Sequence, residues 1–88
     1  NKAQVNEMEQ NIIQILAEIK DKPELADQMS KETRIIDDIG LDSLEMITFI
    51  LRIETDFEVE IDFEEFDLSN LETIATFSDY LLKLQDIH

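Results

Sequence analysis

The 88-residue sequence lacks cysteine and contains only one glycine, one proline and one histidine. Without cysteine, the chain has no disulfide bond, no thiolate metal site and no cysteine nucleophile. Its single glycine, Gly40, excludes the glycine-rich loops that cradle phosphate groups, because these loops need several glycines close together. The only histidine is the last residue, His88, so a catalytic serine would lack its usual base. We therefore expect a protein that is not an enzyme and has no catalytic residues.

Basic residues are also scarce. Seven lysines and arginines stand against 22 acidic residues, which gives a net charge of −15. Such a surface repels nucleic acid, which is not expected as a partner, and attracts proteins with basic surfaces. The acidic stretch 56–67 contains no glycine and does not fit a calcium-binding loop, so no metal site is predicted. The excess of acids is either a solvated face that keeps the protein soluble or a docking surface around Ser43.

Long apolar runs are absent as well. No segment approaches the roughly 20 apolar residues of a membrane span, and no signal peptide is recognisable at the start of the sequence. The hydrophobic content of 43% is nevertheless sufficient for a folded domain with a thin core. We expect one domain, residues 1–88, that is cytoplasmic and monomeric.

Apolar residues recur at helical spacing in three segments. These segments predict long helices over residues 5–20, over residues 42–56, and from residue 69 or 70 onward. A short turn of helix is expected at residues 24–28 and another short helix near residues 63–66, whereas residues 23–41 form a long connection. The stretch 56–64 alternates acidic and apolar residues but has no partner strand, so we expect a loop that buries Val59 and Ile61. The fold class is therefore all-α, a small four-helix bundle of three long helices and one short helix.

Two sequence signals mark helix starts. Asp42 followed by Glu45 predicts a capping box at the second long helix, and Gly40 supplies the backbone freedom for the turn before it. Ser69 followed by Glu72 predicts a second capping box at the last helix.

The second long helix carries two apolar stripes. One is sufficient for a core face: Met46, Phe49, Ile50, Ile53 and Phe57. The other lies on a different side of the helix and consists of Leu44, Ile47 and Leu51. We interpret this second stripe as an exposed contact surface. The alternative is that Leu44 and Leu51 pack under the long loop, whereas exposure is favoured for Ile47.

Ser43 lies in the first turn of this helix, where free N–H groups and the helix dipole favour a phosphate group. The surrounding residues do not form the G-x-S-x-G turn of serine hydrolases. From spacing alone, the interpretation of Ser43 as an ordinary early-helix residue is favoured.

Residues 35–45 read I-I-D-D-I-G-L-D-S-L-E and resemble the phosphopantetheine attachment motif of acyl carrier proteins. The resemblance continues through residues 57–61 and ends in Thr73-Ile74 and residues 79–81. It implies that a phosphopantetheinyl transferase, using coenzyme A and magnesium, attaches 4'-phosphopantetheine to Ser43, with Asp42 as the flanking motif residue. It also implies that the arm carries acyl groups as thioesters in fatty-acid, polyketide or related lipid biosynthesis.

The resemblance further implies contact with enzymes that have basic docking patches: synthases, acyltransferases or ligases. The residues expected to contact such partners are Leu44, Glu45, Ile47, Thr48, Leu51 and Glu54. The residues expected to line a space for the acyl chain are Met46, Phe49, Ile50 and Ile61.

Some residues depart from the pattern of fatty-acid carriers. Thr48 stands where many of them have an acid, Arg52 adds a positive charge, and residues 62–70 lack the usual proline. These departures leave the pathway open and keep an aminoacyl, D-alanyl or peptidyl carrier as alternatives. An unmodified acidic helical adaptor is a further alternative, in which the second apolar stripe alone would bind a basic partner.

Overall fold

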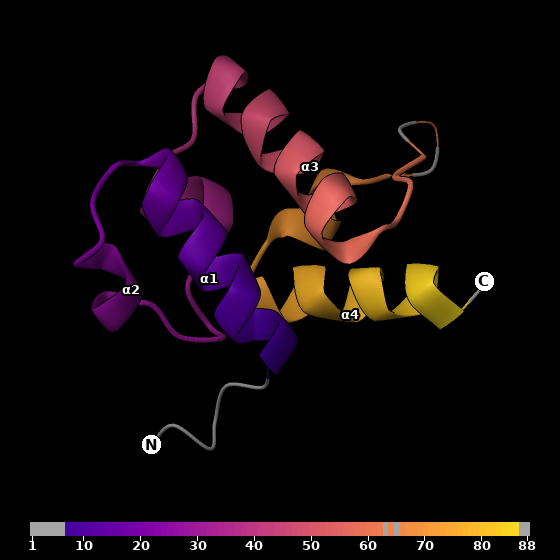
Figure 1. Ribbon diagram of the computed structural model, residues 1–88, viewed down its shortest axis with the longest axis horizontal. Coiled ribbons are helices and arrows are strands. Elements are labelled where there is room, and N and C mark those ends of the chain that lie inside the picture. Colours follow the sequence, from indigo (N-terminus) through magenta and orange to yellow (C-terminus); the bar gives the residue numbers. More distant parts are fainter. Residues whose placement is uncertain (1–6, 63, 65, 87–88) are drawn as a thin grey trace.

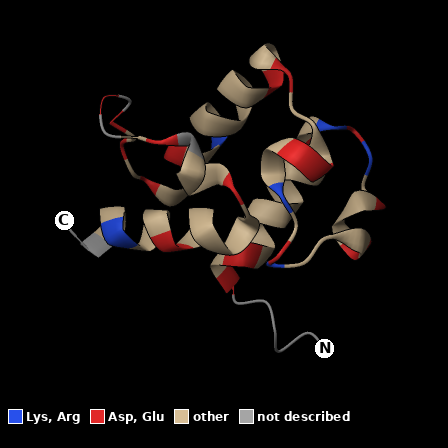
Figure 2. Ribbon diagram, turned by 180° about the vertical axis from the view of Figure 1, so that it is seen from behind, with Lys and Arg blue, Asp and Glu red and all other residues tan. Residues whose placement is uncertain are grey.

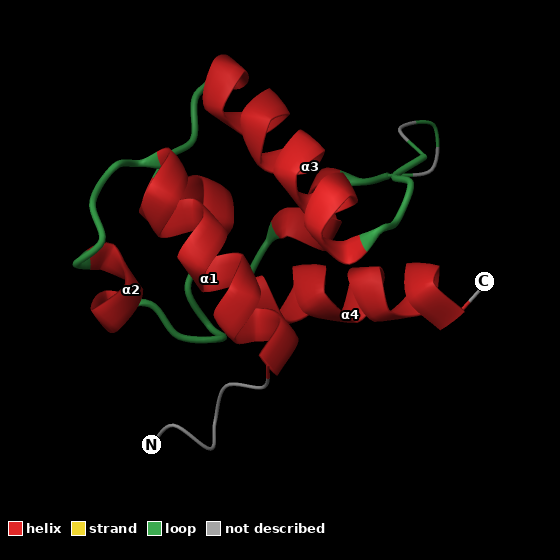
Figure 3. Cartoon of the chain, viewed as in Figure 1, coloured by secondary structure: helices red, strands yellow, loops and turns green. Residues whose placement is uncertain are grey.

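The computed structural model describes residues 7–62, 64 and 66–86. Three long helices dominate it: α1 (Glu7–Ile19), α3 (Ser43–Phe57) and α4 (Ile74–Asp86) (Figure 1). Shorter pieces are the helix α2 (Leu25–Gln28), a π-helical turn η2 (Ile35–Ile39) and a 3₁₀ helix η3 (Leu68–Leu71). No strand occurs among the described residues (Figure 3), and the prediction of an all-α bundle on three long helices is confirmed. None of the helices in these described segments is long and apolar enough to cross a membrane.

Helix α1 is the central element of the arrangement, since it contacts α2, α3 and α4. The core lies where the three long helices meet and contains side chains that are fully buried: Ile12, Leu16, Phe49, Ile53, Ile74, Phe77 and Leu81. The rings of Phe49 and Phe77 lie 5.3 Å apart between their centroids, which joins α3 to α4. Burial of each large apolar side chain contributes about 1.5–3 kcal/mol, so these contacts hold the helices together.

The long connection between α1 and α3 is fixed at several points. Met29 and Ile35 are buried, and the backbone carbonyls of Lys31 and Thr33 accept hydrogen bonds from Ala75 and Ile74. The turn η2 was not predicted. It ends at Gly40, whose φ of 76° is the left-handed conformation that glycine adopts without steric cost.

Helix α4 begins at Ile74, so the predicted start at residue 69 or 70 was wrong. Its first free N–H groups are bound by carbonyls of the long connection, and the Thr76 N–H donates to Thr73 Oγ1 over 3.1 Å. The expected capping box of Ser69 and Glu72 does not form. These residues instead belong to η3 and the turn after it, where the Asp67 carboxylate accepts from the Ser69 N–H.

The chain after α3 confirms the expected loop. Val59 and Ile61 are buried, and the Ile61 N–H donates to Glu54 Oε2 over 2.9 Å. The short helix expected near residues 63–66 includes Phe63 and Glu65, which lie outside the described residues, as do Val5 at the start of the first predicted helix and His88.

Candidate functional site

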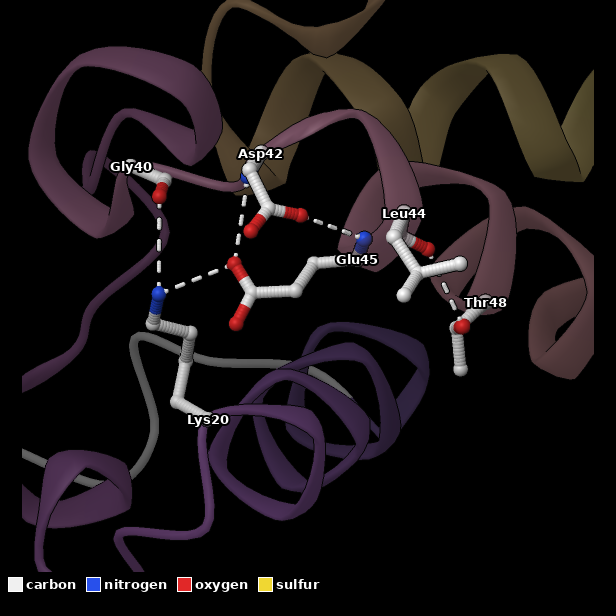
Figure 4. Close-up of polar contacts among 6 residues, drawn as sticks. All are labelled: Lys20, Gly40, Asp42, Leu44, Glu45 and Thr48. Atoms are coloured by element: carbon white, nitrogen blue, oxygen red, sulfur yellow. Dashed lines mark hydrogen bonds and ion pairs between the residues drawn. The ribbon is translucent and has the colours of Figure 1, made fainter.

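Ser43 is the first residue of α3 and is exposed to solvent. The predicted capping box is confirmed in front of it (Figure 4). The Glu45 N–H donates to Asp42 Oδ1 over 2.8 Å, and the Asp42 N–H donates to Glu45 Oε1 over 3.1 Å. The two carboxylates therefore neutralise backbone dipoles at the helix start, and Ser43 is held at a fixed position between them.

The surroundings of Ser43 suit an anionic substituent on its hydroxyl. The capping box leaves the N–H groups of Ser43 and Leu44 without an acceptor in the described part of the chain. Free N–H groups at a helix start and the positive end of the helix dipole both favour a phosphodiester. The described residues include no histidine that could act as a base for its hydroxyl.

A lysine at the end of another helix contacts this turn. Lys20, directly after α1, places Nζ 3.0 Å from Glu45 Oε1 and 3.4 Å from the Gly40 carbonyl oxygen. Sequence reasoning missed this contact because the lysine lies 25 residues before the glutamate and no local pattern connects them.

The second apolar stripe of α3 is exposed. Leu44, Ile47 and Leu51 have 73%, 57% and 57% of their surface accessible. The alternative that Leu44 and Leu51 pack under the long loop is therefore wrong. Thr48 is also exposed on this helix, and its hydroxyl donates to the Leu44 carbonyl over 3.0 Å. We call Leu44, Ile47 and Leu51 the apolar strip.

Charged groups of α3 are engaged within the molecule. The carboxylates of Glu45 and Glu54, both expected to contact partners, accept hydrogen bonds from backbone groups. Arg52 forms ion pairs with Glu18 of α1 at 2.8 Å and with Asp56 at 3.5 Å. The hydrogen bond from Arg52 to Glu18 raises the pKa of Arg52, and the positive charge of this arginine is paired with two carboxylates. In the view from behind, acidic residues occur on several of the helices and connections, whereas lysines and arginines are fewer (Figure 2).

The residues expected to line an acyl-chain space belong to the core. Phe49, Ile50 and Ile61 are buried, and Met46 is half-buried. A cleft of about 350 Å³ lies elsewhere, between α1 and the second half of α3, and none of these four residues lines it. Within the described ranges, no group of three or more potential metal ligands is present.

Comparison with known proteins gives a consistent result. The model of the family described as "Phosphopantetheine attachment site" matches residues 11–81. An acyl carrier protein of Campylobacter jejuni is 39% identical over 59 residues, which cover 66% of this chain and 77% of the relative. An acyl carrier protein of Chlorobium phaeobacteroides is 35% identical over 57 residues, covering 65% and 70% of the two chains. One from Thermotoga maritima is 32% identical over 56 residues, covering 64% and 67%.

Proposed function

The chain belongs to the acyl carrier protein family, which carries 4'-phosphopantetheine and consists of carriers rather than enzymes, and on this premise we propose that Ser43 is the attachment residue. The single observation that carries the proposal is the exposed Ser43 hydroxyl at the capped start of α3. In support, the part of the chain that the family model matches, residues 11–81, includes Ser43.

In the attachment of phosphopantetheine, the residues of this chain position the serine, stabilise negative charge and supply one oxygen atom. Asp42 and Glu45 fix the helix start, and the free N–H groups of the first turn stabilise negative charge next to the modified oxygen. Ser43 supplies that oxygen, which attacks the phosphopantetheine phosphorus of coenzyme A. The pyrophosphate bond breaks, adenosine 3',5'-bisphosphate leaves, and the serine proton passes to a base of the transferase. The bound arm provides a terminal thiol on which acyl groups travel as thioesters.

The cargo that we propose is an acyl intermediate of fatty-acid, polyketide or related lipid biosynthesis. The protein isolated from its host is expected to carry a group that hydroxylamine releases as a hydroxamate without an amino group. Mass spectrometry of the released hydroxamate tests this. An amino acid or peptide hydroxamate would contradict an acyl cargo and favour an aminoacyl or peptidyl carrier, and the absence of any arm would favour an unmodified adaptor.

The surface that we propose for partner enzymes is the apolar strip on α3, with Ile47 at its centre. An exposed apolar side chain can be replaced by arginine with little change in the free energy of unfolding, within about 0.5 kcal/mol. Burial of the introduced charge in a complex is unfavourable, and a central contact residue contributes about 2 kcal/mol or more to binding. Ile47→Arg is therefore expected to raise the KM of a phosphopantetheinyl transferase for this protein by about 30-fold.

A matched control is Leu82→Arg, since Leu82 is 45% exposed but lies on α4. This variant is expected to keep the KM of the wild type. An equal rise of the KM in both variants would mean that added positive charge, and not the apolar strip, determines docking.

A further inference from the structure

The contact of Lys20 joins the end of α1 to the turn that precedes Ser43 (Figure 4). Its ammonium group lies 3.0 Å from Glu45 Oε1 and 3.4 Å from the Gly40 carbonyl oxygen. The carboxylate oxygen that Lys20 binds is the one that accepts from the Asp42 N–H. One lysine therefore contacts both sides of the turn: Gly40, two residues before the helix cap, and Glu45, which closes the capping box.

This contact is partly shielded from water. The side chains of Lys20 and Glu45 are 22% and 28% exposed, which is less than in the other ion pairs of the described residues. Screening by solvent is therefore weaker here than for a pair at the surface. The positive charge also offsets the repulsion between the carboxylates of Asp42 and Glu45, which lie on either side of Ser43.

The contact of Lys20 lies next to Ser43, the proposed attachment residue. We propose that Lys20 is a positioning residue for the modification of Ser43: it holds the Glu45 carboxylate in the capping box and the Gly40 carbonyl in place, so that α1 fixes the turn that presents the serine. This inference rests on the proposed attachment at Ser43. It has a second consequence, because a Glu45 carboxylate bound to Lys20 is not a free acid for the basic patch of a partner.

Amide exchange tests the positioning directly and without any partner enzyme. Lys20→Met keeps a side chain of similar length but removes the charge. In this variant the amide protons of Asp42 and Glu45 are expected to exchange with water about two- to fivefold faster, because loss of a partly exposed ion pair changes the local opening equilibrium by about that factor. Lys20→Arg is expected to keep the wild-type rates. The amide of Phe77 in α4 donates to the carbonyl of Thr73 just before this helix, and it serves as an internal control for the fold. Unchanged rates at Asp42 and Glu45 in Lys20→Met would overturn the proposal.

Kinetics of holo-protein formation test the link to Ser43. With saturating coenzyme A and a promiscuous phosphopantetheinyl transferase, Lys20→Met is expected to lower kcat/KM for the protein about two- to fivefold. Lys20→Arg should restore it. The double variant Lys20→Met/Glu45→Gln should be no slower than the slower single variant, because both changes remove the same contact. Additive losses, or faster modification of Lys20→Met, would show that Lys20 does not act through Glu45.

The two measurements separate this inference from the proposed function. If wild type gains no phosphopantetheine while the exchange rates still change in Lys20→Met, the attachment at Ser43 is wrong and Lys20 has only a structural role. If the wild type is modified and the exchange rates do not change, the attachment stands and the positioning role of Lys20 is wrong.

Discussion

Replacing Ser43 with alanine is expected to abolish the conversion of this protein to its holo form completely. The substitution removes the only oxygen that the proposed attachment uses, so no phosphodiester can form at this position. Incubation with coenzyme A, magnesium and a promiscuous phosphopantetheinyl transferase, followed by intact mass measurement, gives the readout. The wild type should gain the mass of one phosphopantetheine group, and Ser43→Ala should keep its original mass.

The control for this experiment is a second exposed serine. Ser69 lies in η3, away from the capped start of α3, and Ser69→Ala should be modified as fast as the wild type. Because Ser43 is exposed, its loss should change the free energy of unfolding by no more than about 0.5 kcal/mol. A folded Ser43→Ala protein that still gains the full mass would contradict the attachment site, and one that unfolds would contradict the expected stability.

The second large effect concerns stability. Phe77 is fully buried on α4, and its ring lies 5.3 Å from that of Phe49, 6.4 Å from that of Phe66 and 6.2 Å from that of Tyr80. Phe77→Ala is expected to lower the free energy of unfolding by about 3–5 kcal/mol, because it removes these contacts and leaves a cavity. This is a large part of the total stability of a domain of this size, about 4–13 kcal/mol. Urea denaturation followed by circular dichroism measures the change.

Leu82→Ala is the matched control for the stability experiment, since Leu82 is an apolar residue of the same helix that is 45% exposed. Its free energy of unfolding should fall by less than about 1 kcal/mol. Similar midpoints for Phe77→Ala and the wild type would mean that the aromatic contacts between α3 and α4 are not what holds the bundle together.

Local patterns in the sequence were sufficient for much of the fold and the site. The spacing of Phe49, Ile50 and Ile53 predicted the buried face of α3, and all three residues are buried. The pair Asp42 and Glu45 predicted the helix start, because a capping box is formed by residues only three positions apart. The exposure of Ile47 followed from the same helical geometry, since one helix of a small bundle needs only one apolar face.

The features that the sequence predicted wrongly or did not predict share a physical cause: they depend on contacts between segments that are far apart in the sequence. The start of α4 at Ile74 depends on the carbonyls of Lys31 and Thr33, which take the place of the predicted side-chain cap. The pairing of Lys20 with Glu45, and that of Arg52 with Glu18, join residues 25 and 34 positions apart. The periodicity of a sequence does not reveal such pairs. Glu45 and Glu54 were therefore predicted to contact partners, although their carboxylates already accept hydrogen bonds within the fold.

The central claim is that Ser43 carries the phosphopantetheine arm. Its most direct test is fragmentation of the wild-type protein in the mass spectrometer after reaction with the transferase, which locates the added group on the chain. We expect one phosphopantetheine group per molecule. Every fragment that contains Ser43 should carry it, and every fragment without Ser43 should lack it. A group located on another serine or threonine, or no added mass on the folded wild-type protein, would contradict attachment at Ser43.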